Sequence, residues 1–197
     1  MSIEPFNVLQ AVALPITQAN VDTDQILPAR YLQKPRANDF GAYLFRDVRD
    51  HSGGTNNTEF VLNKPVFSSA RIVVAERNFG CGSSREHAVW ALYDYGFRVV
   101  IAPSFGDIFF SNALKNGLLP IVQPVAVIAV LLESVLAKPG ATISVDLDRQ
   151  QLRGPTGKTY DFEINPFARH CLMQGIDELE YTLERLERIE MFECDYV

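Results

Sequence analysis

The amino-acid sequence predicts an α/β protein built around a parallel sheet. Three short β-branched segments, at residues 71–75, 98–102 and 118–122, follow one another in the middle of the chain. Segments of helical character separate them, and this alternation is typical of βαβ units. The chain has 197 residues, of which 47% are hydrophobic. This composition excludes general disorder, and the length favours a single domain over residues 1–197.

The part of the chain before residue 70 is expected to contain few strands. Residues 6–14 predict a strand, and the polar stretch at 20–24 predicts a turn before a short element at 25–32. The segment from 36 to 57 is rich in Asn, Asp and Gly and indicates a long surface loop. Long loops in compact domains are often functional.

Three helices are expected in the middle of the chain. The first covers residues 83–95, the second begins at Ser104 and ends at Gly117, and the third extends from Pro124 to about residue 137. The apolar run at 125–132 predicts that the third helix is buried. This run is too short to cross a bilayer, which requires ~20 residues.

A β-hairpin is expected after residue 140, with arms at 142–147 and 159–164 around a turn at 154–157. The central βαβ units are thus expected to have β-rich flanks on both sides. The final segment, 176–193, is rich in Leu, Glu and Arg. It predicts one or two amphipathic helices whose charges form a solvated face.

Charge and cysteine content limit the partners and the compartment. The 18 Lys and Arg against 24 Asp and Glu give a net charge of −6, which argues against nucleic acid or an anionic membrane as the main partner. The N-terminus lacks the basic-then-apolar order of a signal peptide. Cys81, Cys171 and Cys194 are odd in number and far apart. We therefore expect free thiols in a reducing cytoplasm, and no metal site on this chain.

The stretch from Asn78 to His87, NFGCGSSREH, is the most informative for chemistry. It lies between a predicted strand and a predicted helix, where open α/β sheets bind ligands. It is not a dinucleotide fingerprint, because Arg85 stands where the third Gly should be. Ser83, Ser84 and Arg85 instead belong to a helix N-terminus, which favours an anion, and an Arg fork matches a carboxylate. The stretch predicts a small carboxylate-binding site that would also stabilise a Ser83 alkoxide.

Each of these motifs also has a simpler structural interpretation. Ser83-x-x-Glu86 matches a capping box, which the local pattern alone favours over a catalytic serine. Cys81 is more simply a small packed residue than a nucleophile. The stretch from 20 to 24, NVDTD, is either an Asx turn or a pair of carboxylates that position catalytic groups.

Taken together, the motifs resemble the family of small subunits of bacterial 3-isopropylmalate dehydratase, which is similar to the last domain of aconitase. The Gly-Ser-Ser-Arg-Glu-His string is the most specific of them. The matching segments lie in family order and cover nearly the whole chain: NVDTDQILP (20–28), NFGCGSSREH (78–87), SFGDIF (104–109), NGLLPI (116–121) and FEINPFARHC (162–171).

This resemblance implies a swivelling β/β/α domain and a hydro-lyase reaction in leucine biosynthesis. The reaction interconverts 2- and 3-isopropylmalate through the alkene. The resemblance also implies a 4Fe–4S cluster bound by three cysteines of a separate large subunit, whose iron would act as a Lewis acid. This chain would bind no cluster itself and would act only with that subunit. The hydroxy dicarboxylic acid substrate would be held between the two subunits.

The resemblance also implies roles for individual residues. Ser83 is the base that takes the proton from carbon, and Arg85 holds a substrate carboxylate. Ser84 supplies a further hydrogen bond, and Asp24 falls on the family's active-site aspartate. A second substrate-binding arginine is expected in the loop after the aspartate, and Arg36 is the best candidate there.

Two alternatives to this function stay open at the level of sequence. A paralogous hydro-lyase subunit would act on another 2-hydroxy diacid, such as homocitrate, citramalate or dimethylmalate. A non-enzymatic carboxylate-binding module would keep the fold without the reaction, although the intact Ser83 and Arg85 argue against it.

Overall fold

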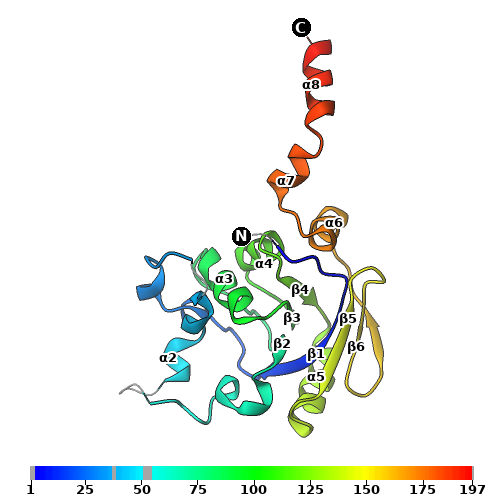
Figure 1. The fold of residues 1–197 in the computed structure, drawn as a ribbon. Helices are drawn as coiled ribbons and strands as arrows, with labels where there is room; N and C mark the ends of the chain where they lie inside the picture. Colours follow the sequence, from blue (N-terminus) through cyan, green and yellow to red (C-terminus); the bar gives the residue numbers. More distant parts are fainter. Residues whose placement is uncertain (1–2, 37–38, 51–54, 197) are drawn as a thin grey trace.

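The computed structural model describes residues 3–36, 39–50 and 55–196 (Figure 1). Within these residues, seven strands form one mixed sheet in the order β4-β3-β2-β1-β5-β6-β7. The strands are β1 (Val8–Ile16), β2 (Ala70–Ala75), β3 (Val99–Ala102), β4 (Leu119–Val122), β5 (Thr142–Asp146), β6 (Gln151–Arg153) and β7 (Thr159–Asp161). Strands β1 to β4 pair in parallel, and β5 to β7 continue the sheet as antiparallel neighbours.

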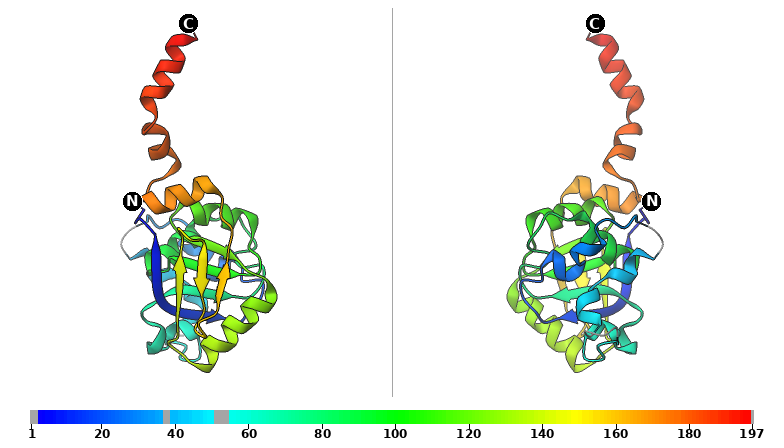
Figure 2. Two further views of the ribbon diagram at one scale, coloured as in Figure 1. Left: turned by 90° about the vertical axis from the view of Figure 1, so that its right-hand side faces the viewer. Right: turned by 90° about the vertical axis from the view of Figure 1, so that its left-hand side faces the viewer.

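Strand β1 joins the two parts of the sheet. Its first half, up to Val12, pairs with β5 in the antiparallel sense, and the second half pairs with β2 in parallel. The register shifts between Val12 and Ala13, and a shift of this kind bends a strand and increases its twist. Figure 2 shows the strand curving through the molecule, so that the sheet is curled rather than flat.

The parallel half confirms the α/β prediction and its central βαβ units. Helix α3 (Glu86–Tyr95) connects β2 to β3, and helix α4 (Asp107–Lys115) connects β3 to β4. The side chains of β3 are buried on both faces, as expected for a parallel strand covered on both sides.

Helix α5 (Val125–Ala137) packs on the sheet with only one of its faces. Ile128, Leu131 and Val135 are buried, whereas Val125 and Val130 are exposed. The prediction that the apolar run 125–132 forms a buried helix is therefore wrong for half of its surface. A run of apolar residues cannot distinguish a buried helix from an amphipathic one, because it has no periodicity.

The N-terminal flank is not β-rich, and it contains few strands, as the sequence before residue 70 predicts. Beyond β1, the described residues up to 69 contribute no strand to the sheet. They form short helical segments instead: α1 (Thr23–Ile26), η1 (Ala29–Tyr31), η2 (Phe40–Tyr43), α2 (Arg46–Arg49), η3 (Val61–Asn63) and η4 (Pro65–Phe67). The expected loop at 36–57 is not only a surface feature, because Phe40, Leu44 and Phe45 are buried in the core. Residues 37–38 and 51–54 of that loop lie outside the described residues.

The C-terminal part ends in three helices. Helix α6 (Pro166–Gln174), which the sequence reasoning did not anticipate, packs near α4. The amphipathic segment predicted after it forms α7 (Glu178–Leu183) and α8 (Leu186–Asp195), which extend away from the rest of the molecule (Figures 1 and 2). No helix among the described residues is long and apolar enough to span a membrane.

Candidate active site

The segments that follow β1, β2 and β3 meet at one edge of the sheet. Parallel strands bring their carboxyl ends to the same edge, and here the backbones continue to pair beyond the strands. The N–H of Thr23 donates to the carbonyl of Cys81 at 2.8 Å, and the N–H of Gly80 donates to the carbonyl of Val21 at 2.8 Å. The N–H of Phe79 donates to the carbonyl of Ser104 at 3.1 Å. The three segments therefore form one connected platform.

Small polar side chains fix this platform. The amide of Asn78 donates to the amide oxygen of Asn20 at 2.9 Å, and the hydroxyl of Ser104 accepts from the N–H of Asn78 at 2.9 Å. The buried hydroxyl of Thr23 donates to the carbonyl of Ser83 at 3.0 Å. The sequence reasoning missed these roles. A usable signal was that each residue comes shortly after a predicted strand within a matched motif.

The two aspartates of the first motif have different tasks. Asp22 caps helix α1: its Oδ1 accepts from the N–H of Asp24 at 2.7 Å, and the side chain of Gln25 accepts from the N–H of Asp22 at 3.0 Å. Gly82, with a φ of +91°, packs so closely here that a Cβ would lie 2.2 Å from Asp22 Oδ2. Asp22 is therefore structural, whereas the side chain of Asp24 is exposed and takes no part in the cap.

Helix α3 starts later than predicted, and the capping-box interpretation of Ser83 is wrong. The helix begins at Glu86 with Arg85 at the N-cap position, and no side chain caps it. Glu86 instead accepts a hydrogen bond from the amide of Asn116 at 2.7 Å. The chain turns at Gly80 and Gly82, both with positive φ, which keeps Ser83 outside the helix. Its exposed hydroxyl forms no hydrogen bond within the described residues.

Arg85 and Asp24 form an ion pair that joins the two motifs, through Nη1 of the guanidinium. Both residues stand beside the uncapped start of α3, next to the exposed Ser84. The structure thus brings four of the predicted residues to one place: Asp24, Ser83, Ser84 and Arg85. An uncapped helix N-terminus and an arginine fork together suit an anion, and a carboxylate above all.

Arg36 is engaged elsewhere. Its Nε and Nη2 donate to the two carboxylate oxygens of Asp94 at 2.9 and 2.7 Å, and its guanidinium lies 5.3 Å from the ring centroid of Trp90. Asp94 is in the last turn of α3, whereas Arg85 precedes the first turn. The structure therefore does not bring Arg36 to the other predicted residues, and its contact with substrate stays a prediction.

Cys81 lies within the platform, but its environment does not favour a nucleophile. Burial and the nearby carboxylate of Asp22 raise the pKa of the Cys81 thiol, so that the thiol stays protonated at neutral pH. Among the described residues, no three His, Cys, Asp or Glu side chains gather so that they could hold a metal ion. An iron–sulfur cluster requires several convergent thiolates, and the residues that the structure describes do not fit one.

Comparisons with known proteins agree with the motifs. The family described as aconitase C-terminal domain matches residues 3–126, and a second family, described as LeuD_N, matches residues 129–166. The 3-isopropylmalate dehydratase small subunit of Magnetococcus marinus is 46% identical, over 98% of this chain and 95% of the relative. The subunit of the same name from Afipia carboxidovorans is 47% identical, over 98% and 96%.

A solved structure supports the same assignment. The crystal structure of 3-isopropylmalate dehydratase from Methanocaldococcus jannaschii matches with a TM-score of 0.66 and 27% sequence identity, over 96% of this chain and 99% of that one. These matches confirm both the predicted resemblance and the α/β fold. The chain belongs to the family of 3-isopropylmalate dehydratase small subunits, and it has the fold of the aconitase C-terminal domain.

Proposed function

We propose that this chain is the small subunit of a cytoplasmic hydro-lyase that isomerises 2-isopropylmalate to 3-isopropylmalate in leucine biosynthesis. The observation that carries the proposal is the group formed by Ser83, Ser84, Arg85 and Asp24 at the uncapped start of α3. The relatives named as small subunits of this dehydratase support the substrate and imply a large subunit as partner.

In this proposal Arg85 binds one carboxylate of the substrate. The guanidinium offers donors in a fixed fork, and its ion pair with Asp24 uses Nη1. Ser84 and the first N–H groups of α3 would supply further hydrogen bonds to the same carboxylate. Arg36 would bind the second carboxylate only after leaving Asp94.

Ser83 is the proposed base. The proton to be removed lies on the carbon next to a substrate carboxylate, so that its removal develops negative charge on that carboxylate. Arg85 and the positive end of the α3 dipole stabilise this charge, and they also stabilise the alkoxide form of Ser83. The proton moves to Ser83 Oγ, and in the reverse direction the same oxygen returns a proton to carbon.

The site on this chain is one half of an enclosed pocket. Ser83, Ser84 and Asp24 are exposed on an open surface, and the electrostatic stabilisation proposed here requires bulk solvent to be kept out of the site. We therefore assign the opposite wall to the large subunit. The 4Fe–4S cluster belongs to that subunit in this proposal, because the donor set among the described residues of this chain does not fit a cluster.

The proposal is tested with Ser83→Ala and Ser83→Gly in complex with the large subunit, at matched cluster content. Loss of the base should lower kcat at least about 10³-fold in both variants, equivalent to ~4 kcal/mol. Because Ser83 does not cap α3, the free energy of unfolding should change by less than ~0.5 kcal/mol. Ser84→Ala is the matched control and should lose about tenfold. A glycine variant that keeps more than about a tenth of wild-type kcat would refute the base assignment.

The substrate is tested separately, by turnover of 2-isopropylmalate against homocitrate, citramalate and dimethylmalate in the wild-type complex. A higher kcat/KM for any of the other three acids would show that the complex carries out the same chemistry on that acid instead.

A further inference from the structure

Residues 176–196 form an arm that leaves the body of the molecule (Figures 1 and 2). Its base is anchored. The ring of Tyr181 packs edge-on against Phe167 with the centroids 4.7 Å apart, and Lys115 forms an ion pair with Glu178 at 3.4 Å. A capping box between Asp177 and Glu180 starts α7.

The far end of the arm has no such support. No hydrogen bond, ion pair or ring contact joins α8 to any described residue before Tyr181. The helix has 10 residues, and isolated helices of that length are marginal in water. Helix α8 therefore requires a surface to pack against.

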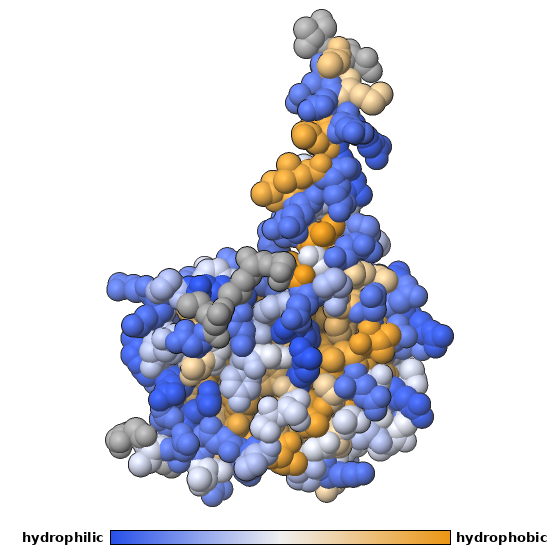
Figure 3. Space-filling model, in the orientation of Figure 1, coloured by the Kyte–Doolittle hydropathy of each residue, from blue (hydrophilic) through white to orange (hydrophobic). Residues whose placement is uncertain are grey.

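An apolar stripe marks the side of the arm that would be covered. Its members are between 37% and 80% exposed: Leu179, Leu183, Leu186, Ile189, Phe192 and Tyr196. At about 100° per residue, the stripe residues of α8 share one face, and Met191 lies on the opposite face. Figure 3 shows exposed apolar side chains along the arm. Exposed apolar surface of this extent is a mark of an interaction site.

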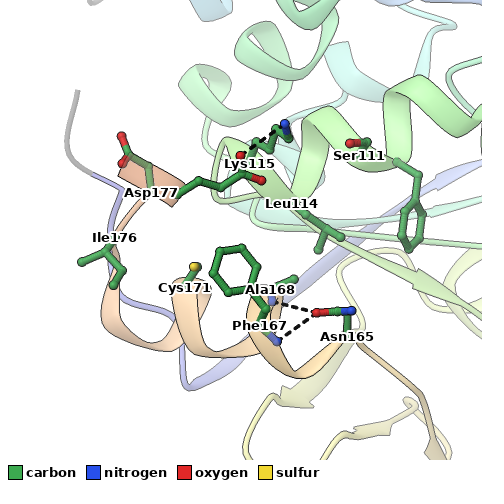
Figure 4. A pocket seen from close by; sticks show the side chains of 11 residues that line it. Ser111, Leu114, Lys115, Asn165, Phe167, Ala168, Cys171, Ile176 and Asp177 are labelled. Atoms are coloured by element: carbon green, nitrogen blue, oxygen red, sulfur yellow. Dashed lines mark hydrogen bonds and ion pairs between the residues drawn. The ribbon is translucent and has the colours of Figure 1, made fainter. Parts of the chain in front are cut away.

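A pocket of about 330 Å³ lies at the base of the arm, between α4, α6 and the residues that lead into α7 (Figure 4). Much of its lining is apolar and includes Leu114, Phe167, Cys171 and Ile176. An apolar side chain of the partner that covers the stripe would fit this pocket. The apolar surface therefore continues from the arm onto the body of the molecule.

The charge of the arm indicates which kind of partner surface it fits. Residues 177–195 contain eight acidic and two basic residues, and these account for the whole net charge of −6. Residues 1–176 have 16 charges of each sign and are neutral. Two arms side by side would bring together two strongly acidic segments, which repel each other. A second copy of this chain is therefore disfavoured, and the surface that fits is an apolar groove with Lys and Arg at its rim.

We propose that the arm docks its apolar stripe into a cationic-rimmed apolar groove of the large subunit. This inference rests on the proposed function, which supplies that partner. The matches to both families end at or before residue 166, so the arm lies outside the matched regions. The relatives named as small subunits, in contrast, align over 98% of this chain and so extend into the arm.

The test compares Ile189→Asp, on the stripe, with Met191→Asp, which makes the same change in charge on the opposite face. The Kd for the large subunit is measured by calorimetry, with circular dichroism as a check on folding. We expect Ile189→Asp to raise the Kd at least tenfold and Met191→Asp to change it less than threefold. Because the arm is no part of the proposed catalytic group, kcat at saturating large subunit should stay at the wild-type value in both. The double variant Glu190→Lys, Glu193→Lys should also bind at least tenfold more weakly.

Three results would overturn the inference. If the wild-type complex forms and is active but the two aspartate variants bind alike, the arm is not the docking surface, and the proposed function still stands. If the wild-type chain does not bind the large subunit at all, the proposed function fails and the inference fails with it. If the chain alone sediments as a dimer that only Ile189→Asp dissociates, the stripe binds a second copy instead.

Discussion

Gly82→Ala tests whether the close contact between the two motifs holds the site together. The added Cβ would lie 2.2 Å from Asp22 Oδ2 and 2.7 Å from Asp22 Cγ, so the carboxylate must turn away. Asp22 then loses the hydrogen bond from the N–H of Asp24, and α1 loses its cap.

The loss of folding free energy expected for Gly82→Ala has two parts. An alanine at a φ of +91° costs about 1–2 kcal/mol of backbone energy. Loss of the Asp22 cap costs about 1 kcal/mol more. Gly157→Ala is the control, because Gly157 has a φ of +85° and its Cβ would meet Arg153 only at an ordinary 3.5 Å. We expect Gly82→Ala to destabilise by about 2–3 kcal/mol and Gly157→Ala by about 1–2 kcal/mol.

Urea denaturation of both variants and of Asp22→Ala measures these values. If the clash with Asp22 is the cause, Gly82→Ala and Asp22→Ala are not additive, because the cap can be lost only once. The double variant should then be more stable than the sum predicts, by about 1 kcal/mol. Equal losses for Gly82→Ala and Gly157→Ala, with additivity in the double variant, would refute the role of Asp22.

Two further predictions concern the arginines. Arg85→Lys keeps the charge but loses the planar fork. The kcat/KM of the complex should therefore fall at least tenfold, equivalent to ~1.4 kcal/mol. Unchanged kinetics would show that Arg85 is a purely structural cation. Asp94→Asn breaks the pair with Arg36, in which the two side chains are only 7% and 19% exposed. It should destabilise by about 3 kcal/mol in urea denaturation, whereas a loss below about 1 kcal/mol would show that Arg36 is held loosely enough to reach the substrate.

The parts of the fold that depend on local pattern could be predicted from the sequence. The β-branched segments and the helices between them became β2, α3, β3, α4 and β4 within a few residues. The central position of β1 could not be predicted, since its pairing with β5 joins residues 130 to 138 positions apart. Helix α6 was missed although its signals were present: Asn165 caps it, Pro166 starts it and Gly175 ends it.

The candidate site was predicted by motif, but its internal partners were not. The capping-box interpretation of Ser83 relied on spacing alone. Spacing does not reveal that Gly80 and Gly82 both turn with positive φ and hold Ser83 out of the helix. In the same way, neither Asp24 for Arg85 nor Asp94 for Arg36 could be identified, because both pairs join residues about 60 positions apart. Such pairs are set by tertiary packing.

The ion pair between Arg85 and Asp24 explains how the site can stay intact without its substrate. A lone guanidinium beside an uncapped helix N-terminus would leave two positive potentials unopposed, and the carboxylate of Asp24 balances them. The pair is partly exposed, and pairs of this kind contribute about 0–1 kcal/mol. A substrate carboxylate that binds the fork with two hydrogen bonds gains more than that. In the proposed function, Asp24 would therefore give up its contact with Arg85 at little cost, and it would then lie next to the bound substrate.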